Sequence, residues 1–241
     1  SLFNNRPYRG CILVGVGTHK GADSLDWYTK RLYRKVLSSQ YAHSVRDEAT
    51  KELVEELGLR AINTGCPTMW GFTHDFCRQI PAGKSGSVVF TLTDYGTDSV
   101  SDKKLIEVLD SNYGRIYFWP QGLSDEEYFH AIVSPRIEEK VTILRPTLES
   151  FETVLRSGET DYVGTRLHAG MFAMQHKVRS IIVAIDNRVR DMRKTYSFMS
   201  IDREAIEDLT KMITDSWSTD VEIDENAIGR WKEQFLHNSS I

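Results

Sequence analysis

An arginine and a histidine two positions apart form the strongest candidate for a reactive site in this sequence. They lie in the run Gly164-Thr-Arg-Leu-His-Ala-Gly170, where an apolar segment ends and a helical pattern begins. The first turn of a helix offers unpaired N–H groups and a positive dipole end, and Thr165 is placed to cap it. Arg166 adds a planar fork of donors suited to carboxylate or phosphate, and histidine, here His168, ordinarily exchanges protons near neutral pH. The run therefore predicts a site that holds an anion beside a proton donor.

The same short motif also fits a purely structural arrangement. In that arrangement Arg166 pairs with a surface carboxylate and His168 packs beneath the helix, which is common for so short a pattern. The position at a strand end favours the reactive interpretation, because ligands of open parallel sheets bind beyond the carboxyl ends of the strands. The same rule selects seven loops, at residues 17–21, 46–47, 94–97, 120–122, 145–146, 164–168 and 186–188.

Weaker candidates lie in three of these loops. Asp47 is expected to cap a helix. Arg46 fits two interpretations equally well, a salt bridge or a contact with a bound anion. Gly17 and His19 lie in a run similar to a phosphate-binding loop, but the third glycine of a dinucleotide motif and the Gly-Lys-Ser/Thr of a P-loop are missing. His19 is expected either to lie in solvent or to contact a second substrate. The run 186–188, which is Asp186, Asn187 and Arg188, would contact a substrate or form a turn.

Composition excludes several classes of protein. The chain of 241 residues carries 30 basic and 34 acidic side chains, and its net charge of −4 argues against nonspecific nucleic-acid binding. The three cysteines form no Cys-x-x-Cys pair, which favours a reducing compartment, and no cluster has the spacing of a metal site. No apolar run approaches the ~18 residues of a membrane span, and no signal peptide opens the sequence. We therefore expect a cytoplasmic protein without a metal or a cofactor.

The elements that must position these residues alternate along the chain. Strands are expected at residues 11–16, 41–45, 87–92, 115–119, 140–144, 162–164 and 180–185. Helices are expected at residues 23–38, 47–57, 102–110, 148–156, 166–176, 202–214 and 224–237, with a further helix opened by a capping box at 124–127. Repeated strand–helix units favour parallel strands joined by right-handed crossovers, so the sequence predicts an α/β fold with a doubly wound sheet.

The strongest motif has a counterpart in a known family. Residues 164–178 and the apolar run 181–186 resemble the C-terminal signature of the polysaccharide pyruvyl transferases, in which Arg-Leu-His-Ala precedes a helix and a hydrophobic strand. Residues 44–48 and 13–17 resemble two further elements of that family. The resemblance extends over about residues 10–215 and is most specific at 161–191.

Two positions depart from the family pattern. Arg179 stands where the family commonly has a proline, and Arg188 stands where it commonly has a lysine. Neither change removes the positive charge that the pattern requires. The glycine- and asparagine-containing loop that the family has before residue 10 is missing.

The resemblance implies a GT-B-like fold of two Rossmann-like lobes with doubly wound parallel sheets, of which the N-terminal lobe is expected to be incomplete. Residues 1–78 would belong to this N-terminal, acceptor-side lobe, residues 79–220 would form the C-terminal, donor-side lobe, and residues 221–241 a C-terminal helix.

The resemblance also implies a reaction. A pyruvyl group would pass from phosphoenolpyruvate to two hydroxyls of a sugar, in a polysaccharide or a lipid-linked precursor, to form a cyclic ketal during exopolysaccharide biosynthesis for the cell envelope. His168 would be the general acid, and Arg166 would stabilise the departing phosphate. The donor would be bound by Thr165, Arg166, Leu167, His168 and Arg46, with further contacts from Gly17, His19, Asp186, Asn187 and Arg188.

Two other functions remain open on the sequence alone. A nucleotide-sugar glycosyltransferase could share the fold, although no acidic residue is clearly placed for a ribose after a glycine-rich turn. A noncatalytic lobe that binds glycans is the other alternative. It would bind ligand without turnover and would lose little when His168 is replaced.

Overall fold

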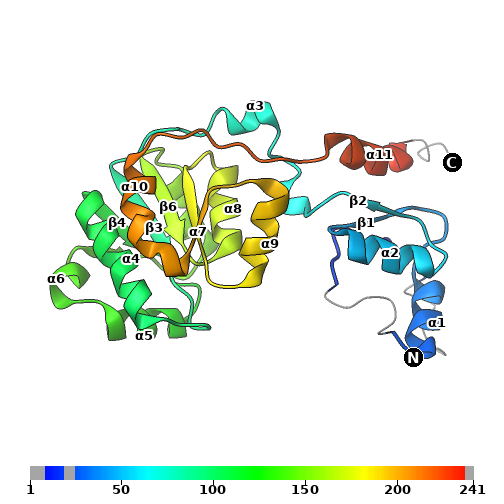
Figure 1. Cartoon of the computed structure of the whole chain (residues 1–241), viewed down its shortest axis with the longest axis horizontal. Coiled ribbons are helices and arrows are strands. Elements are labelled where there is room, and N and C mark those ends of the chain that lie inside the picture. The colour runs from blue at the N-terminus through cyan, green and yellow to red at the C-terminus, as the bar shows by residue number, and fades with distance from the viewer. Residues whose placement is uncertain (1–8, 19–24, 237–241) are drawn as a thin grey trace. The chain divides into compact units, whose positions relative to one another are not determined.

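Six parallel strands form the larger sheet of this protein (Figure 1). The order across the sheet is β5-β4-β3-β6-β7-β8. The chain begins in the middle with β3, moves outward through β4 and β5, and then crosses to the other side of β3 to add β6, β7 and β8. In such sheets ligands bind at the carboxyl ends of the two strands where the direction reverses, here β3 and β6. The bounds are β3 Ser87–Thr91, β4 Arg115–Phe118, β5 Val141–Ile143, β6 Thr160–Gly164, β7 Ser180–Ala184 and β8 Ser200–Asp202.

The computed structural model describes residues 9–18 and 25–236, and contacts divide the chain into two units. The six-stranded sheet belongs to Phe72–Glu222, called unit 2 below. Unit 1 combines residues 1–71 with residues 223–241. Both units contain a parallel sheet, so the α/β class expected from the sequence is confirmed. Within the described residues, none of the helices combines the length and the apolarity needed to cross a membrane.

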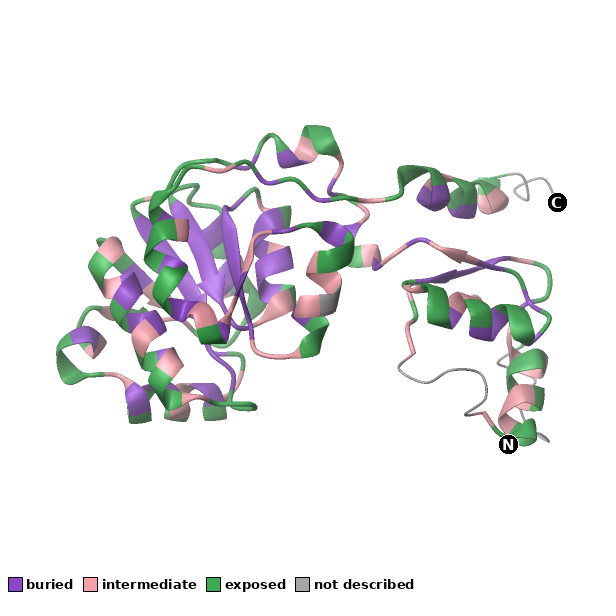
Figure 2. Cartoon of the chain, viewed as in Figure 1, coloured by how far each residue is buried: buried purple, intermediate pink, exposed green. Residues whose placement is uncertain are grey.

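Helices cover both faces of the large sheet because its strands are apolar on both sides. Val88 and Phe90 contribute to a core with α4, α5, η4 and α10, whereas Tyr162, on the opposite face, packs against Phe151 of α7. Every residue of β3, β6 and β7 is buried. Figure 2 shows the central strands of the sheet in purple, the colour of buried residues. The helices of unit 2 are α3 His74–Cys77, α4 Ser99–Asn112, α5 Leu123–Ile132, α6 Pro135–Glu138, α7 Leu148–Leu155, α8 Leu167–Gln175, α9 Asn187–Tyr196, η4 Arg203–Asp208 and α10 Leu209–Thr214.

Two glycines let α8 and its preceding strand pack closely. A side chain at Gly164 would collide with the Oγ1 of Thr91 and would approach its backbone N within 2.7 Å. A side chain at Gly170 would lie 2.7 Å from Cγ1 of Ile182 and 3.0 Å from the ring of Tyr162. The start of α8 is therefore fixed directly over the carboxyl end of β6.

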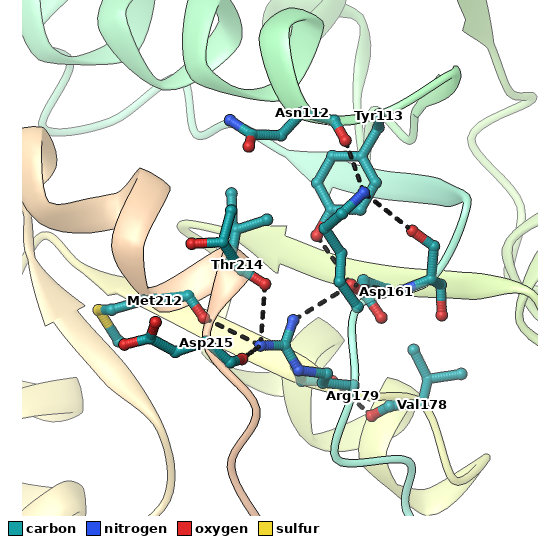
Figure 3. A network of polar contacts seen from close by, with 12 residues as sticks. Asn112, Tyr113, Asp161, Val178, Arg179, Met212, Thr214 and Asp215 are labelled. Atoms are coloured by element: carbon teal, nitrogen blue, oxygen red, sulfur yellow. Dashed lines mark hydrogen bonds and ion pairs between the residues drawn. The ribbon is translucent and has the colours of Figure 1, made fainter.

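A buried ion pair lies near the amino-terminal ends of the strands, and Figure 3 shows its contacts. Arg179 and Asp161 are each 1% exposed and lie 3.2 Å apart. The same carboxylate accepts a hydrogen bond from the hydroxyl of Tyr113 at 2.8 Å. The guanidinium also donates to the backbone carbonyls of Met212, Ile213 and Asp215, at the C-terminal end of α10. Arg179, which departs from the family pattern, therefore ties the sheet to a helix end that would otherwise leave carbonyls unpaired.

Unit 1 contains a smaller parallel sheet of β1 and β2. The C-terminal helix α11 packs on this unit, where Trp231 contacts Trp70 and donates to the carbonyl of Ala42 at 2.9 Å. Gln234 adds hydrogen bonds to both backbone groups of Ala42. The bounds are α1 Trp27–Val36, β1 His43–Val45, α2 Glu48–Glu56, β2 Ala61–Asn63, η3 Pro67–Met69 and α11 Glu225–Leu236.

Several expected elements differ from the structure. Residues 11–16 form isolated bridges at Cys11 and Val16 in place of a continuous strand. The expected capping box at 124–127 is wrong, because α5 begins at Leu123 with Gly122 as its N-cap and has no side-chain cap. The sequence prediction missed the strands β2 and β8, the short helices α3 and α6, and the longer helix α9. Helix α9 has the sequence NRVRDMRKTY, in which three apolar residues, Val189, Met192 and Tyr196, lie on one face among seven polar or charged ones.

Candidate active site

A pocket of about 110 Å³ lies at the point where the strand order reverses, at the carboxyl ends of β3 and β6. It is lined by segments that follow β3, β4, β6 and β7. Six residues proposed from the sequence contribute to its lining, namely Thr165, Arg166, Leu167, His168, Asp186 and Arg188. Tyr95, Gln121, Ala169 and Val189 complete it.

The first turn of α8 presents unpaired backbone donors to this pocket. The helix begins at Leu167 and its N-cap residue is Arg166, whose side chain makes no capping hydrogen bond. In the part of the chain that the structure describes, the N–H groups of Leu167, His168 and Ala169 have no hydrogen-bond partner. The expectation that Thr165 caps this helix is wrong. Thr165 is buried, and its hydroxyl is bonded to the carbonyl of Thr91 at 3.4 Å.

Arg166 is held closely by a buried carboxylate and at a longer distance by an exposed one. Its Nη2 donates to both oxygens of Asp125, at 2.6 and 2.8 Å, and Asp125 is only 1% exposed. Its Nε donates to the carbonyl of Leu92 at 3.3 Å. A second carboxylate, Asp94, lies 3.5 Å from Nη2. Within the described residues, the Nη1 group has no partner and keeps its donors for a ligand.

A second guanidinium group shares an aromatic neighbour with Arg166. The ring of Tyr95 lies 5.1 Å from the Cζ of Arg166 and 5.9 Å from that of Arg188. Arg188 donates to the hydroxyl of Tyr95 at 3.1 Å and to the carboxylate of Asp186 at 2.6 Å. Burial alone would raise the pKa of Asp186, but the hydrogen bonds and charge of Arg188 lower it overall. The same hydrogen bonds raise the pKa of Arg188, so both groups stay charged.

His168 lies exposed on the first turn of α8, and it contributes to the lining of the pocket. The alternative in which this imidazole packs beneath the helix is therefore contradicted. No hydrogen bond joins the His168 ring to another residue of the described chain, so the ring is available to a bound ligand.

The remaining candidates lie elsewhere. Asn187 is exposed at the first position of α9 and does not line the pocket, whereas Asp186 caps that helix by accepting from the N–H of Arg188 at 2.9 Å. Gly17 and Arg46 belong to unit 1, where a side chain at Gly17 would collide with that of Arg46. Asp47 caps α2 as expected. His19 falls outside the described residues. A role of Gly17, Arg46 or His19 in donor binding stays a prediction.

Sequence reasoning did not identify Asp125, Tyr95 or Gln121 as site residues. The strand-end rule did select the loops at 94–97 and 120–122, so a signal existed for the segments but not for the side chains. Asp125 falls inside the run 124–127 that resembles a capping box, and nothing local connects it with Arg166, which lies 41 residues away. Among the described residues, no three His, Cys, Asp or Glu side chains gather as a metal ion would require.

Comparisons with known proteins give one family. The sequence model described as polysaccharide pyruvyl transferase matches residues 1–187. None of the curated proteins matches the chain.

Two solved structures of Os79 from O. sativa are similar in part. The complex with U2F and trichothecene has a TM-score of 0.41 and 12% identity, over 81% of this chain and 48% of that one. The complex with UDP has a TM-score of 0.38 and 14% identity, over 81% of this chain and 49% of that one. The chain thus spans about half the length of these structures.

Proposed function

Because this chain belongs to the polysaccharide pyruvyl transferase family, we propose that it transfers the pyruvyl group of phosphoenolpyruvate to two hydroxyls of a sugar. The observation that carries the proposal is the pocket at the start of α8, where unpaired N–H groups, the guanidinium of Arg166 and the exposed imidazole of His168 face the same space. The reaction is proposed to occur in the cytoplasm, where phosphoenolpyruvate is made, and to serve exopolysaccharide biosynthesis.

The donor has two anionic groups that match this pocket. The phosphate is proposed to bind the N–H groups of Leu167, His168 and Ala169, because a helix N-terminus favours anions. The carboxylate would then lie toward the free Nη1 of Arg166, with Arg188 beside the same Tyr95 ring. A guanidinium suits this role because its donors are planar and permanently charged.

His168 is proposed as the general acid. It would donate a proton to the methylene carbon of phosphoenolpyruvate, so that positive charge develops at the neighbouring carbon, which carries the phosphate oxygen. A sugar hydroxyl would attack that carbon and lose its proton. The bond between this carbon and the phosphate oxygen would then break, and inorganic phosphate would leave with the electron pair.

Ring closure completes the reaction. A second hydroxyl of the same sugar would attack the same carbon and release its proton, which gives the cyclic ketal. Of the two hydroxyl protons, one would return His168 to its protonated form, and the other would pass to the released phosphate. Arg166 and the α8 N–H groups would stabilise the charge of the leaving phosphate, an effect of about 3 kcal/mol for each donor in related electrostatic sites.

The proposal is tested by adding phosphoenolpyruvate to the ¹⁵N-labelled protein and following its backbone amide resonances. The amides of Leu167, His168 and Ala169 should shift as the donor fills the pocket. Ser150 serves as the matched control, because its N–H in the first turn of α7 is already capped by Thr147. Its resonance should stay in place.

Two outcomes would contradict the proposal. One is that phosphoenolpyruvate leaves the three α8 amides unchanged. The other is that a UDP-sugar shifts them and phosphoenolpyruvate does not, which would favour a nucleotide-sugar glycosyltransferase.

A further inference from the structure

Asp125 is a buried carboxylate that no step of the proposed reaction uses. It lies in the first turn of α5 and is 1% exposed. Its oxygens accept four hydrogen bonds, from the N–H of Asp94 at 3.0 Å, from the N–H of Gln121 at 2.9 Å, and from Nη2 of Arg166 at 2.6 and 2.8 Å. A carboxylate accepts about four such bonds, so this one is saturated.

The groups that donate to Asp125 belong to three segments that line the pocket. Asp94 precedes Tyr95 in the loop after β3, Gln121 lies in the loop after β4, and Arg166 follows β6. These segments lie far apart in the sequence. A single side chain therefore links three walls of the pocket.

The same contacts fix the orientation of the Arg166 guanidinium. Nη2 donates to Asp125 and Nε donates to the carbonyl of Leu92, so the guanidinium is held along the edge that these two nitrogens form. The ring of Tyr95 lies 5.1 Å from its Cζ. Nη1 is then the part of the fork that is left for a ligand.

We propose that Asp125 is a positioning residue that holds Arg166, together with the loops that carry Tyr95 and Gln121, in the geometry that binds the donor. This inference rests on the proposed function for the identity of the donor. Asp125 acts through Arg166 and does not touch the substrate.

A buried carboxylate can also matter for stability alone, and the chain offers a matched control for that role. Asp161 is equally buried at 1% exposure, pairs with Arg179 at 3.2 Å, and likewise accepts a backbone N–H, from Ser85 at 3.2 Å. It is the second residue of β6, near the amino end of that strand, whereas the pocket lies at the carboxyl ends. Figure 3 shows its contacts with Arg179 and Tyr113. Loss of either carboxylate charge should weaken the fold, but only Asp125 is bonded to residues that line the pocket.

The experiment compares Asp125→Asn with Asp161→Asn. Asparagine keeps the size and shape of the aspartate side chain but replaces one acceptor oxygen with an NH2 group. At either site that NH2 group would face other hydrogen-bond donors. We expect both variants to melt at a lower temperature. Asp125→Asn should raise the Kd for phosphoenolpyruvate about tenfold or more, because a misplaced guanidinium loses its ligand geometry. Asp161→Asn should leave the Kd within about twofold. Equal effects of the two substitutions on the Kd would overturn the inference.

A second measurement uses the wild-type protein, in case Asp125→Asn does not fold. The Nε–H resonance of Arg166, assigned by its loss in Arg166→Lys, should already be protected from solvent exchange without any ligand. The Nε–H of Arg136, whose side chain is 67% exposed and is bound only through Nη2 among the described residues, should exchange faster. Protection of Arg166 that develops only on addition of phosphoenolpyruvate would show that the group is not held in advance, and the inference would fail.

The two proposals fail in different ways. If the protein does not bind phosphoenolpyruvate but the Nε–H of Arg166 is protected, the proposed function is wrong. The inference that the Arg166 guanidinium is held in a fixed position would still stand. If the donor binds but Asp125→Asn leaves its Kd and the Nε–H protection unchanged, the positioning role is wrong and the function remains.

Discussion

Arg166 serves the fold and the ligand at the same time. Asp125 is buried, so removal of its partner would leave a charge without compensation in a medium of low polarity. We expect Arg166→Met to lower the free energy of unfolding by about 3–5 kcal/mol. Arg188→Met, at a side chain that is 57% exposed, should cost at most about 1 kcal/mol. Urea unfolding followed by circular dichroism measures both, and a similar loss for the two variants would contradict this interpretation.

His168 should matter for catalysis and little for stability, because it is exposed and has no partner in the described chain. His168→Ala is expected to reduce turnover of phosphoenolpyruvate by about a hundredfold or more, as loss of a general acid does. His130→Ala is a suitable control, since that imidazole is 43% exposed on α5 and does not line the pocket. Phosphate release is the assay, and equal activity of the two variants would exclude His168 as the proton donor.

At the scale of elements, the close packing of α8 on the sheet determines where its N-terminus lies. Gly170→Ala should destabilise unit 2 by about 1–3 kcal/mol, because the added methyl group would lie 2.7 Å from Ile182. Gly229→Ala in α11 meets no atom within 4 Å and should be neutral or stabilising, since alanine favours helix. Thermal unfolding of the two variants tests the contrast, and a Gly170→Ala protein as stable as the wild type would show that α8 can move outward.

The sequence predicted best those elements whose signal is local. The strand that ends at Gly164 and the helix that follows it are confirmed, because apolar runs and glycines report directly on backbone geometry. The contacts of Arg166 were not predictable in the same way. Asp125 and Tyr95 are brought to it by the order of the strands, which a single sequence does not display. Helix α9 was missed because charged and polar residues outnumber the three apolar residues of its buried face.

At the scale of the whole molecule, the chain leaves unit 1 after Gly71 and returns to it at Ile223. Its last helix supplies partners for Trp70 and for the backbone of Ala42. A chain that ends at Glu222 is therefore expected to lose the structure of unit 1 and to keep that of unit 2. Amide spectra of the truncated and complete chains test this, and preserved resonances for β1 and β2 would show that α11 is dispensable.

Two buried tyrosines make the stability of unit 2 depend on alkaline pH. Burial raises the pKa of Tyr113, with the charge of Asp161 adding to it, and burial raises the pKa of Tyr162. In the unfolded chain both ionise near the ordinary pKa of about 10. Stability should therefore be constant below that pH and fall above it, by up to about 1.4 kcal/mol per pH unit for each tyrosine.

Urea unfolding between about pH 9 and pH 11 measures this dependence. Tyr113→Phe and Tyr162→Phe should each make the curve less steep. A wild-type curve that stays level across this range would mean that the hydroxyls are not shielded in the folded state.

The pairing of each arginine in the pocket with an acid has a kinetic consequence. Asp125 neutralises Arg166, Asp186 neutralises Arg188, and Asp94 adds a negative charge 3.5 Å from Arg166, so these groups have no net positive charge to attract an anion over a distance. Electrostatic steering should contribute little, and the association rate of phosphoenolpyruvate with unit 2 should change only slightly with ionic strength. Recognition would then depend on short-range contacts made after the donor has entered the pocket. Changes in affinity would appear mainly in the dissociation rate.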